Sequence, residues 1–185
     1  MARLPLASRD TVPENQRDAF DEIVKNLGSV PRFGPGSVIL HVPHAHQRLM
    51  GFNRFLRSES SLPKKLQELA MIVTARELDC QYIWNAHAAS AREAGVAAAT
   101  VDALRERKEL PKLSDDETAV VRFAQEFFRT HRVSRGTFQL ALEQLGKQGA
   151  VELGLFLGNY ASLALMVNSF DVDLPPDRKE PLMPV

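Results

Sequence analysis

The strongest pattern of apolar positions along the chain predicts a buried helix over residues 64–78. Its apolar side chains lie on opposite sides of a helical projection, and a helix that is apolar nearly all round is normally buried. Glu68 lies within this stretch, and its neighbours one and two turns on are Met71, Ile72 and Ala75. We therefore expect the Glu68 carboxylate to lie among apolar side chains, where it needs a partner.

Helical spacing of apolar residues predicts further helices on both sides of this segment. A loop rich in proline and glycine, with one helical turn at 37–41, separates the first two of them. Sustained alternation of apolar and polar residues, the signal for β-strands, is absent. The pattern predicts an all-α fold, a single-domain helical bundle. Its expected helices are 13–26 before Gly28, 45–57, 80–94 with Asp79 as N-cap and Gly95 beyond its end, 97–107, one begun by the Ser114–Glu117 capping box, one from Ser134 to Gly146, and 150–170.

The apolar run over residues 150–170 is long enough to span a bilayer, so a membrane helix has to be weighed against a core helix. Glu152, Asn159 and Asn168 interrupt the run and argue against a membrane helix. We predict a core or subunit-interface helix. Beyond it, the proline-rich residues 175–185 cannot continue a helix and are expected to form an extended tail.

Composition limits the class of protein and its partners. The chain has 185 residues, and its 23 Lys and Arg residues balance 23 Asp and Glu residues. This balance indicates neither a nucleic-acid nor a membrane partner. A single cysteine allows no internal disulfide, and the first residues lack the apolar run of a signal peptide, so we expect a cytoplasmic protein.

Three side chains that can carry chemistry are expected to meet at the centre of the chain. Cys80 and His87 are seven residues apart on one helix, about two turns, and so point in nearly the same direction. Glu68 on the preceding helix reaches the same face if the two helices fold back on each other. A second cluster, His41, His44 and His46, is interrupted by Pro43 and has no acid beside it, so no metal site is expected there.

The central segment resembles the carboxymuconolactone decarboxylase family, which includes the alkylhydroperoxidase D type enzymes. Glu68, Cys80, Tyr82, Trp84 and His87, followed by Ala-Arg-Glu-Ala-Gly at 91–95, carry the resemblance. It implies an all-helical, alkylhydroperoxidase D-like fold and a homo-oligomer. Position 83 is isoleucine, whereas the peroxidase branch has a second cysteine there and many decarboxylase-like members have an acid.

The resemblance covers roughly residues 35–174. It divides the chain into an N-terminal arm and helix at 1–34, the helical domain at 35–174 and the tail at 175–185.

The resemblance implies catalytic roles for Cys80, His87 and Glu68, with Tyr82, Ile83 and Trp84 lining a substrate pocket. The favoured hypothesis is a thiol-dependent hydroperoxide reductase without a cofactor, which acts on a small molecule and is recycled by an external thiol. His87, oriented by Glu68, serves as the base, and the helix start favours a reactive Cys80 thiolate. The alternatives are a decarboxylase-like acid–base enzyme acting on a small carboxylated lactone, and a catalytically silent helical oligomer that binds a ligand. Whether the chain is an enzyme at all stays open at this point.

Overall fold

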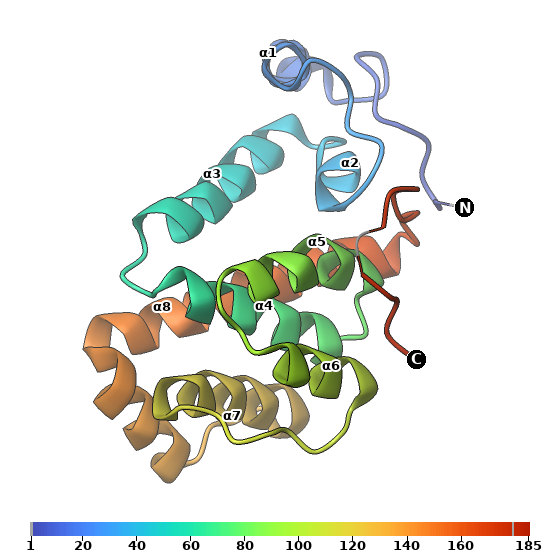
Figure 1. Ribbon diagram of the computed structural model, residues 1–185. Coiled ribbons are helices and arrows are strands. Elements are labelled where there is room, and N and C mark those ends of the chain that lie inside the picture. The colour runs from blue at the N-terminus through green and yellow to red at the C-terminus, as the bar shows by residue number, and fades with distance from the viewer. Residues whose placement is uncertain (1, 179) are drawn as a thin grey trace.

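All regular structure in the computed structural model, which describes residues 2–178 and 180–185, is helical. Within those residues there is no β-strand, so the prediction of an all-α fold is confirmed. Figure 1 shows the arrangement of the helices. In chain order they are a short 3-10 helix (Glu14–Gln16), α1 (Arg17–Leu27), α2 (Pro35–Ile39), α3 (Pro43–Glu59), α4 (Lys64–Glu77), α5 (Gln81–Glu93), α6 (Ala98–Glu106), α7 (Asp115–Thr130) and α8 (Arg135–Ser169).

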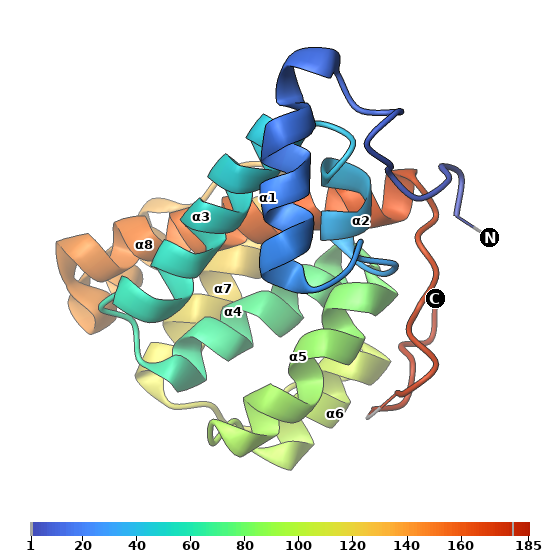
Figure 2. The ribbon, with the colours of Figure 1, turned by 90° about the horizontal axis from the view of Figure 1, so that it is seen from above.

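Helix α4 is the central element of the fold. Every residue from Leu66 to Arg76 is buried, and the helix packs against α5, α7 and α8. Figures 1 and 2 show α4 in the middle of the other helices. A helix that is apolar nearly all round has to be covered on every side, so the sequence pattern explains this central position.

Most helix ends lie where capping signals predict them. Gly28 and Gly95 end α1 and α5 in the left-handed conformation, with φ of 78° and 96°. The capping box at Ser114 and Glu117 begins α7, and the Ser134 side chain accepts a hydrogen bond from the Thr137 amide at the start of α8.

The expected break at Gly146 is a kink inside one helix. Gly146 has φ 70° and ψ 177°, a conformation that favours glycine. The two predicted helices, ending at Gly146 and covering 150–170, therefore join into α8.

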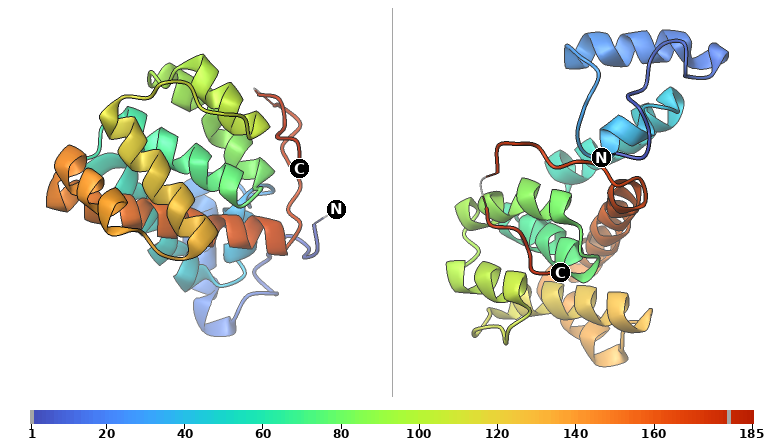
Figure 3. Two further views of the ribbon diagram at one scale, coloured as in Figure 1. Left: turned by 90° about the horizontal axis from the view of Figure 1, so that it is seen from below. Right: turned by 90° about the vertical axis from the view of Figure 1, so that its right-hand side faces the viewer.

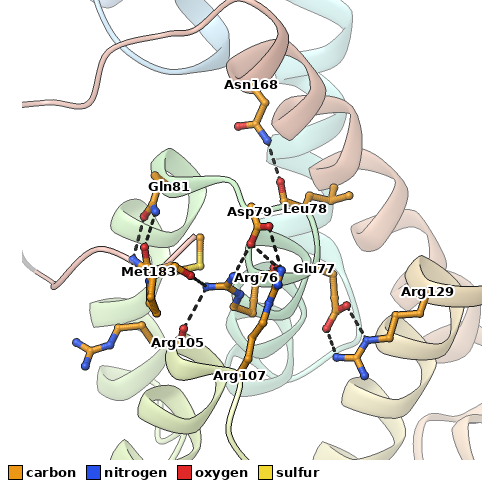
Figure 4. Close-up of polar contacts among 11 residues, drawn as sticks. Arg76, Glu77, Leu78, Asp79, Gln81, Arg105, Arg107, Arg129, Asn168 and Met183 are labelled. Carbon is orange, nitrogen blue, oxygen red and sulfur yellow. Dashed lines mark hydrogen bonds and ion pairs between the residues drawn. The ribbon is translucent and has the colours of Figure 1, made fainter.

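The prediction that Asp79 caps α5 is wrong. The N-cap is Cys80, and Asp79 itself has a positive φ of 49°. Its carboxylate accepts hydrogen bonds from the guanidinium groups of Arg76 and Arg107 instead of from the first amides of α5. Figure 4 shows both arginines pointing at Asp79 in the turn between α4 and α5. Two nearby cations compete successfully with the helix amides for the same oxygens.

Helix α8 is long and apolar enough to cross a membrane by length and composition, but 56% of its most apolar stretch is buried inside the protein. Its polar residues bond to neighbouring segments. Glu152 accepts from Ser60 and Ser61, Asn159 donates to Asn53, and Asn168 donates to the carbonyl of Leu78. These contacts support the interpretation of α8 as a core helix.

Helices α1 to α3 form a layer on one side of the α4 core, and the termini lie on another side (Figures 1 and 3). A small second core, centred on Phe20, Ile23 and Leu40, holds this layer together.

The tail contains no helix in its described residues, as expected, and it packs along α5 (Figure 2). Met183 is buried, and its backbone exchanges hydrogen bonds with the Gln81 side chain. The division of the chain at residues 34 and 174 stays a prediction.

Candidate functional site

Glu68 and His87 form a buried hydrogen-bonded pair between α4 and α5. The Nδ1 atom of His87 lies 2.8 Å from Oε2 of Glu68, which is fully buried. Because a carboxylate only accepts, Nδ1 of His87 donates this hydrogen bond. In the neutral tautomer that the bond favours, the lone pair is on Nε2. Glu68 therefore fixes both the tautomer and the orientation of His87, which is the arrangement of a general base with its orienting acid.

Two cations flank the other oxygen of Glu68. Lys64 Nζ lies 2.7 Å from Oε1, and Arg57 approaches the same atom from α3 at 4.0 Å. Burial acts to raise the pKa of Glu68, but the hydrogen bonds and charges of His87 and Lys64 outweigh it and hold the pKa below its ordinary value. Glu68 is therefore ionised at neutral pH.

Tyr160 from α8 closes the site on the side of His87. The two rings meet edge to face with their centroids 5.2 Å apart, and Phe156 stacks on Tyr160. Tyr160 is 2% exposed, and burial raises the pKa of its phenol above the ordinary range. The phenol therefore keeps its proton and can act only as a neutral hydrogen-bonding group beside the imidazole.

Cys80 lies at the N-cap of α5 and is fully buried. Burial raises the pKa of its thiol, although the backbone amides of Ile83 and Tyr82 act in the opposite direction. This direction is opposite to the stabilised thiolate expected from the sequence. The helix start does favour the anion, but the loss of hydration outweighs it. Cys80 is therefore a protonated thiol at rest.

The side chains between Cys80 and His87 are apolar or aromatic. Ile83 and Trp84 are buried to 2% and 0% exposure, and the Trp84 indole donates to the carbonyl of Pro181 in the tail. Ile83 is four residues before His87 and so occupies the adjacent position on the same face of α5. Direct contact between Cys80 and His87 is therefore not expected, since about 10 Å of helix separates their backbones.

Tyr82 is half-buried and packs against Gly34. A side chain at Gly34 would meet the Tyr82 ring at 2.4 Å, and Gly34 has a positive φ of 73°. Burial raises the pKa of Tyr82, and the neighbouring Cys80 acts in the same direction. The phenol therefore lies within electrostatic reach of the cysteine and stays protonated.

A surface hollow of about 310 Å³ opens beside the start of α5. Its lining includes Asp79, Gln81 and Tyr82, Val167 and Asn168 from the end of α8, and Asp171 beyond that helix. Asp79 and Gln81 are the neighbours of Cys80 in the chain.

The structure thus joins Glu68 and His87 directly and places Cys80 and Ile83 on the same helix. Sequence reasoning missed Arg57, Lys64 and Tyr160. Lys64 carried a usable signal, because its spacing of four residues from Glu68 is that of a helical ion pair. Arg57 and Tyr160 come from helices far away in the sequence, and no local pattern points to them.

The three histidines at 41–46 do not converge. His41 contacts the carbonyl of Pro5 through Nε2 at 3.0 Å, and the backbone amide of His44 donates to Gln16. His46 turns into a separate cavity. No group of His, Cys, Asp and Glu side chains within the described part of the chain has the geometry of a metal site.

The segment that contains this site is similar to a known protein family. Residues 43–126 match the model of the carboxymuconolactone decarboxylase family. Over this segment the chain is similar to that family. The matched segment contains Glu68, Cys80 and His87, so the hydrogen-bonded pair and the thiol both lie within it. No curated protein shows significant sequence similarity to the chain.

Solved structures share its fold at low sequence identity. The alkylhydroperoxidase AhpD core of an uncharacterized peroxidase-related protein from Ralstonia eutropha JMP134 is 18% identical, covers 95% of this chain and 93% of its own, and has a TM-score of 0.71. A peroxidase-related protein from Silicibacter sp. TM1040 is 16% identical, with coverages of 95% and 92% and a TM-score of 0.71.

The debrominase Bmp8 is also similar. A variant with a cysteine replaced by alanine, in complex with 2,3,4-tribromopyrrole, is 15% identical, with 95% of each chain covered and a TM-score of 0.67. At these identities the likeness establishes the alkylhydroperoxidase D-like fold of the chain.

Proposed function

We propose that the protein is an enzyme whose reaction depends on proton transfer by His87, and that its reaction is the reduction of a small hydroperoxide by Cys80. The observation that carries the proposal is the 2.8 Å hydrogen bond between His87 and the ionised, buried Glu68. It leaves Nε2 of His87 as a base in a largely apolar site. Named relatives of the same fold include peroxidase-related proteins, which supports this choice of reaction.

The reaction begins with removal of the thiol proton, because burial keeps Cys80 protonated. His87 accepts this proton through a water molecule or the substrate, since Ile83 lies between the two residues on the helix. The thiolate attacks one peroxide oxygen, an S–O bond forms, the O–O bond breaks, and the leaving alkoxide takes the proton back from His87. Cys80 is then a sulfenic acid.

The cycle needs two further reducing equivalents. With a single cysteine in the chain, they come from external thiols. The first thiol condenses with the sulfenic acid to give a mixed disulfide and water, and the second releases Cys80 as the other thiol is oxidised to a disulfide.

A second function is acid–base catalysis on a small carboxylated substrate, and one observation favours it. Arg57 and Lys64 stand beside the Glu68–His87 pair with side chains 44% and 50% exposed. Half-exposed cations at this position can hold a substrate carboxylate while His87 removes or returns a proton. Cys80 is then a packing residue, in keeping with its complete burial.

One set of variants separates the two functions. Purified protein is assayed with cumene hydroperoxide and dithiothreitol, and in parallel with a carboxylated lactone. Under the peroxidase proposal, Cys80→Ser abolishes peroxide consumption, and His87→Ala and Glu68→Gln each reduce it about a hundredfold or more. His131→Ala, an exposed histidine, serves as the matched control and leaves the rate unchanged.

Lactone turnover that survives Cys80→Ser but is lost in His87→Ala would establish the acid–base function instead. Turnover of neither substrate, with both native and variant chains folded by circular dichroism, would contradict both functions and favour a ligand-binding oligomer.

A further inference from the structure

A separate cavity lies between α1, α2 and α3, the helices that form the layer on one side of the core. Its volume is about 540 Å³, within the range of small-molecule sites. Its walls include the apolar side chains of Ile23 and Leu27 from α1, Pro31 from the following loop and Met50 from α3. No side chain of the Glu68–His87 site lines it, so the cavity is a distinct feature of the molecule.

His46 is the buried polar group of this cavity. It is 7% exposed, and neither ring nitrogen has a hydrogen-bond partner among the described residues. Gly36, which also lines the cavity, lies against the ring, and a side-chain carbon there would be 3.6 Å from Nε2. The ring nitrogens are not among the fully buried atoms that lack a partner, so they keep some contact with solvent. A ligand in the cavity can replace that water as their hydrogen-bond partner.

The electrostatics of the cavity favour a neutral ligand. Burial lowers the pKa of His46, so its ring is neutral and offers one N–H donor and one acceptor nitrogen. The charged residues of the lining, Glu22 and Arg54, have opposite signs, and Glu22 already accepts a hydrogen bond from Gln47. The lining of the cavity therefore favours neither an anionic nor a cationic ligand.

Leu27 forms part of the cavity wall and is 54% exposed. Exposed apolar surface beside a buried, unpartnered imidazole indicates a ligand with an apolar body and one hydrogen-bonding group.

We propose that this cavity binds a small neutral molecule with an apolar body and a single hydroxyl group, a simple phenol or alcohol, whose hydroxyl bonds to His46. A hydroxyl group both donates and accepts, so it matches either nitrogen of the neutral ring. The body then packs between α1 and α3 against Ile23, Leu27 and Met50. This site is independent of the reaction proposed for Cys80.

The test is a titration of the full chain with 4-methylphenol, followed by calorimetry and by the NMR signals of the histidine rings. Toluene has the same apolar body without the hydroxyl, and 4-methylbenzoate replaces the hydroxyl by a charge. His46→Phe keeps an aromatic ring in the cavity but removes its hydrogen-bonding groups. His44→Phe is the matched control, because its side chain does not line the cavity.

The proposal predicts saturable binding of 4-methylphenol to the native and His44→Phe chains, with shifts of the His46 ring signals and none for His131. 4-Methylphenol binds to His46→Phe about tenfold more weakly than to the native chain, and toluene binds to the native chain about tenfold more weakly than 4-methylphenol does. Each loss corresponds to one hydrogen bond that is not formed.

Absence of saturable binding, equal binding of 4-methylphenol to His46→Phe, or tighter binding of 4-methylbenzoate would each overturn the proposal. If His46→Phe does not fold, the NMR signals of the native chain test the proposed hydrogen bond without the variant. A His46 ring signal that moves equally with 4-methylphenol and toluene then contradicts the hydrogen bond.

Discussion

Glu68 and Cys80 lie near each other in the chain, and burial acts on both, but their pKa values move in opposite directions. Burial acts to raise the pKa of each group, yet Glu68 has His87 and Lys64 as charged or hydrogen-bonding partners, and its pKa falls. Cys80 has only backbone amides to oppose burial, and its pKa rises. A partner within hydrogen-bonding distance therefore decides which of the two groups is charged at neutral pH.

The first prediction concerns the reactivity of Cys80. Because its pKa is raised and its side chain is fully buried, iodoacetamide should label native Cys80 at pH 7 at least about tenfold more slowly than it labels free cysteine. The unfolded chain in urea serves as the control and should react like free cysteine. The prediction is contradicted if native Cys80 is labelled faster than free cysteine and the labelling slows in His87→Ala. That result would show a stabilised thiolate.

Single residues also show how far the sequence alone can go. The burial of Glu68 and its need for a partner followed from apolar neighbours at helical spacing. The choice of His87 as a candidate came from its spacing to Cys80 on the next helix, and its catalytic role from the family resemblance. The direction of the Cys80 pKa could not be predicted. It depends on how completely the tertiary structure removes water from the thiol, and local spacing carries no information on that.

At the scale of helices, the sequence located most boundaries because capping residues act locally. Gly28, Gly95 and the Ser114–Glu117 box all end or begin helices as expected. The prediction of Asp79 as the N-cap of α5 was wrong because Arg107, twenty-eight residues beyond it, donates to the Asp79 carboxylate. Capping signals consider only residues close in the chain and therefore miss this contact. The course of the tail along α5 likewise depends on hydrogen bonds from Gln81 and Trp84 to the carbonyls of Met183 and Pro181. The spacing of apolar residues along a helix does not predict these contacts.

The second prediction concerns Glu152, which ties α8 to the turn between α3 and α4. Burial acts to raise its pKa, but hydrogen bonds from Gln148, Ser61 and Ser60 lower it from 4.5 to about 2. A lowered pKa in the folded state means a contribution to stability that is complete above about pH 4.5 and is lost as the pH falls toward 2.

Glu152→Gln should therefore lower the free energy of unfolding by about 1 to 3 kcal/mol at pH 7. Urea unfolding at several pH values measures this, and the difference from the native chain should vanish near pH 2. Glu143→Gln, an exposed residue of the same helix, should have little effect. A loss of stability that is the same at pH 3 and pH 7 would show that the carboxylate charge is not the cause.

At the scale of the whole molecule, one face of α8 is left uncovered in a single chain. Val151, Leu155 and Leu165 are 64%, 39% and 59% exposed, and helical geometry puts all three on one side. Gly154 and Gly158 lie on the same side, with no atom within 4 Å of an added side-chain carbon. Small and apolar residues on one exposed face allow another helix to approach closely.

The third prediction is that this face of α8 mediates homo-oligomer formation. Light scattering coupled to size-exclusion chromatography should give a mass above that of the monomer at micromolar concentration. Leu155→Glu and Leu165→Glu should each shift the mass toward the monomer, because a buried, unpaired charge opposes association. Leu4→Glu, an exposed apolar residue of the N-terminal arm, is the control. A native chain that runs as a monomer would contradict the prediction.

The fourth prediction tests the proposed function most directly and measures a single turnover. One equivalent of cumene hydroperoxide is mixed with reduced protein without added thiol, and Cys80 sulfenic acid is trapped with dimedone and quantified by mass spectrometry over time. Sulfenic acid should appear on Cys80 in step with peroxide loss, and His87→Ala and Glu68→Gln should each slow its formation about a hundredfold. Peroxide loss without modification of Cys80, or sulfenic acid that forms equally fast in His87→Ala, would contradict proton transfer by His87 to and from a reacting thiol.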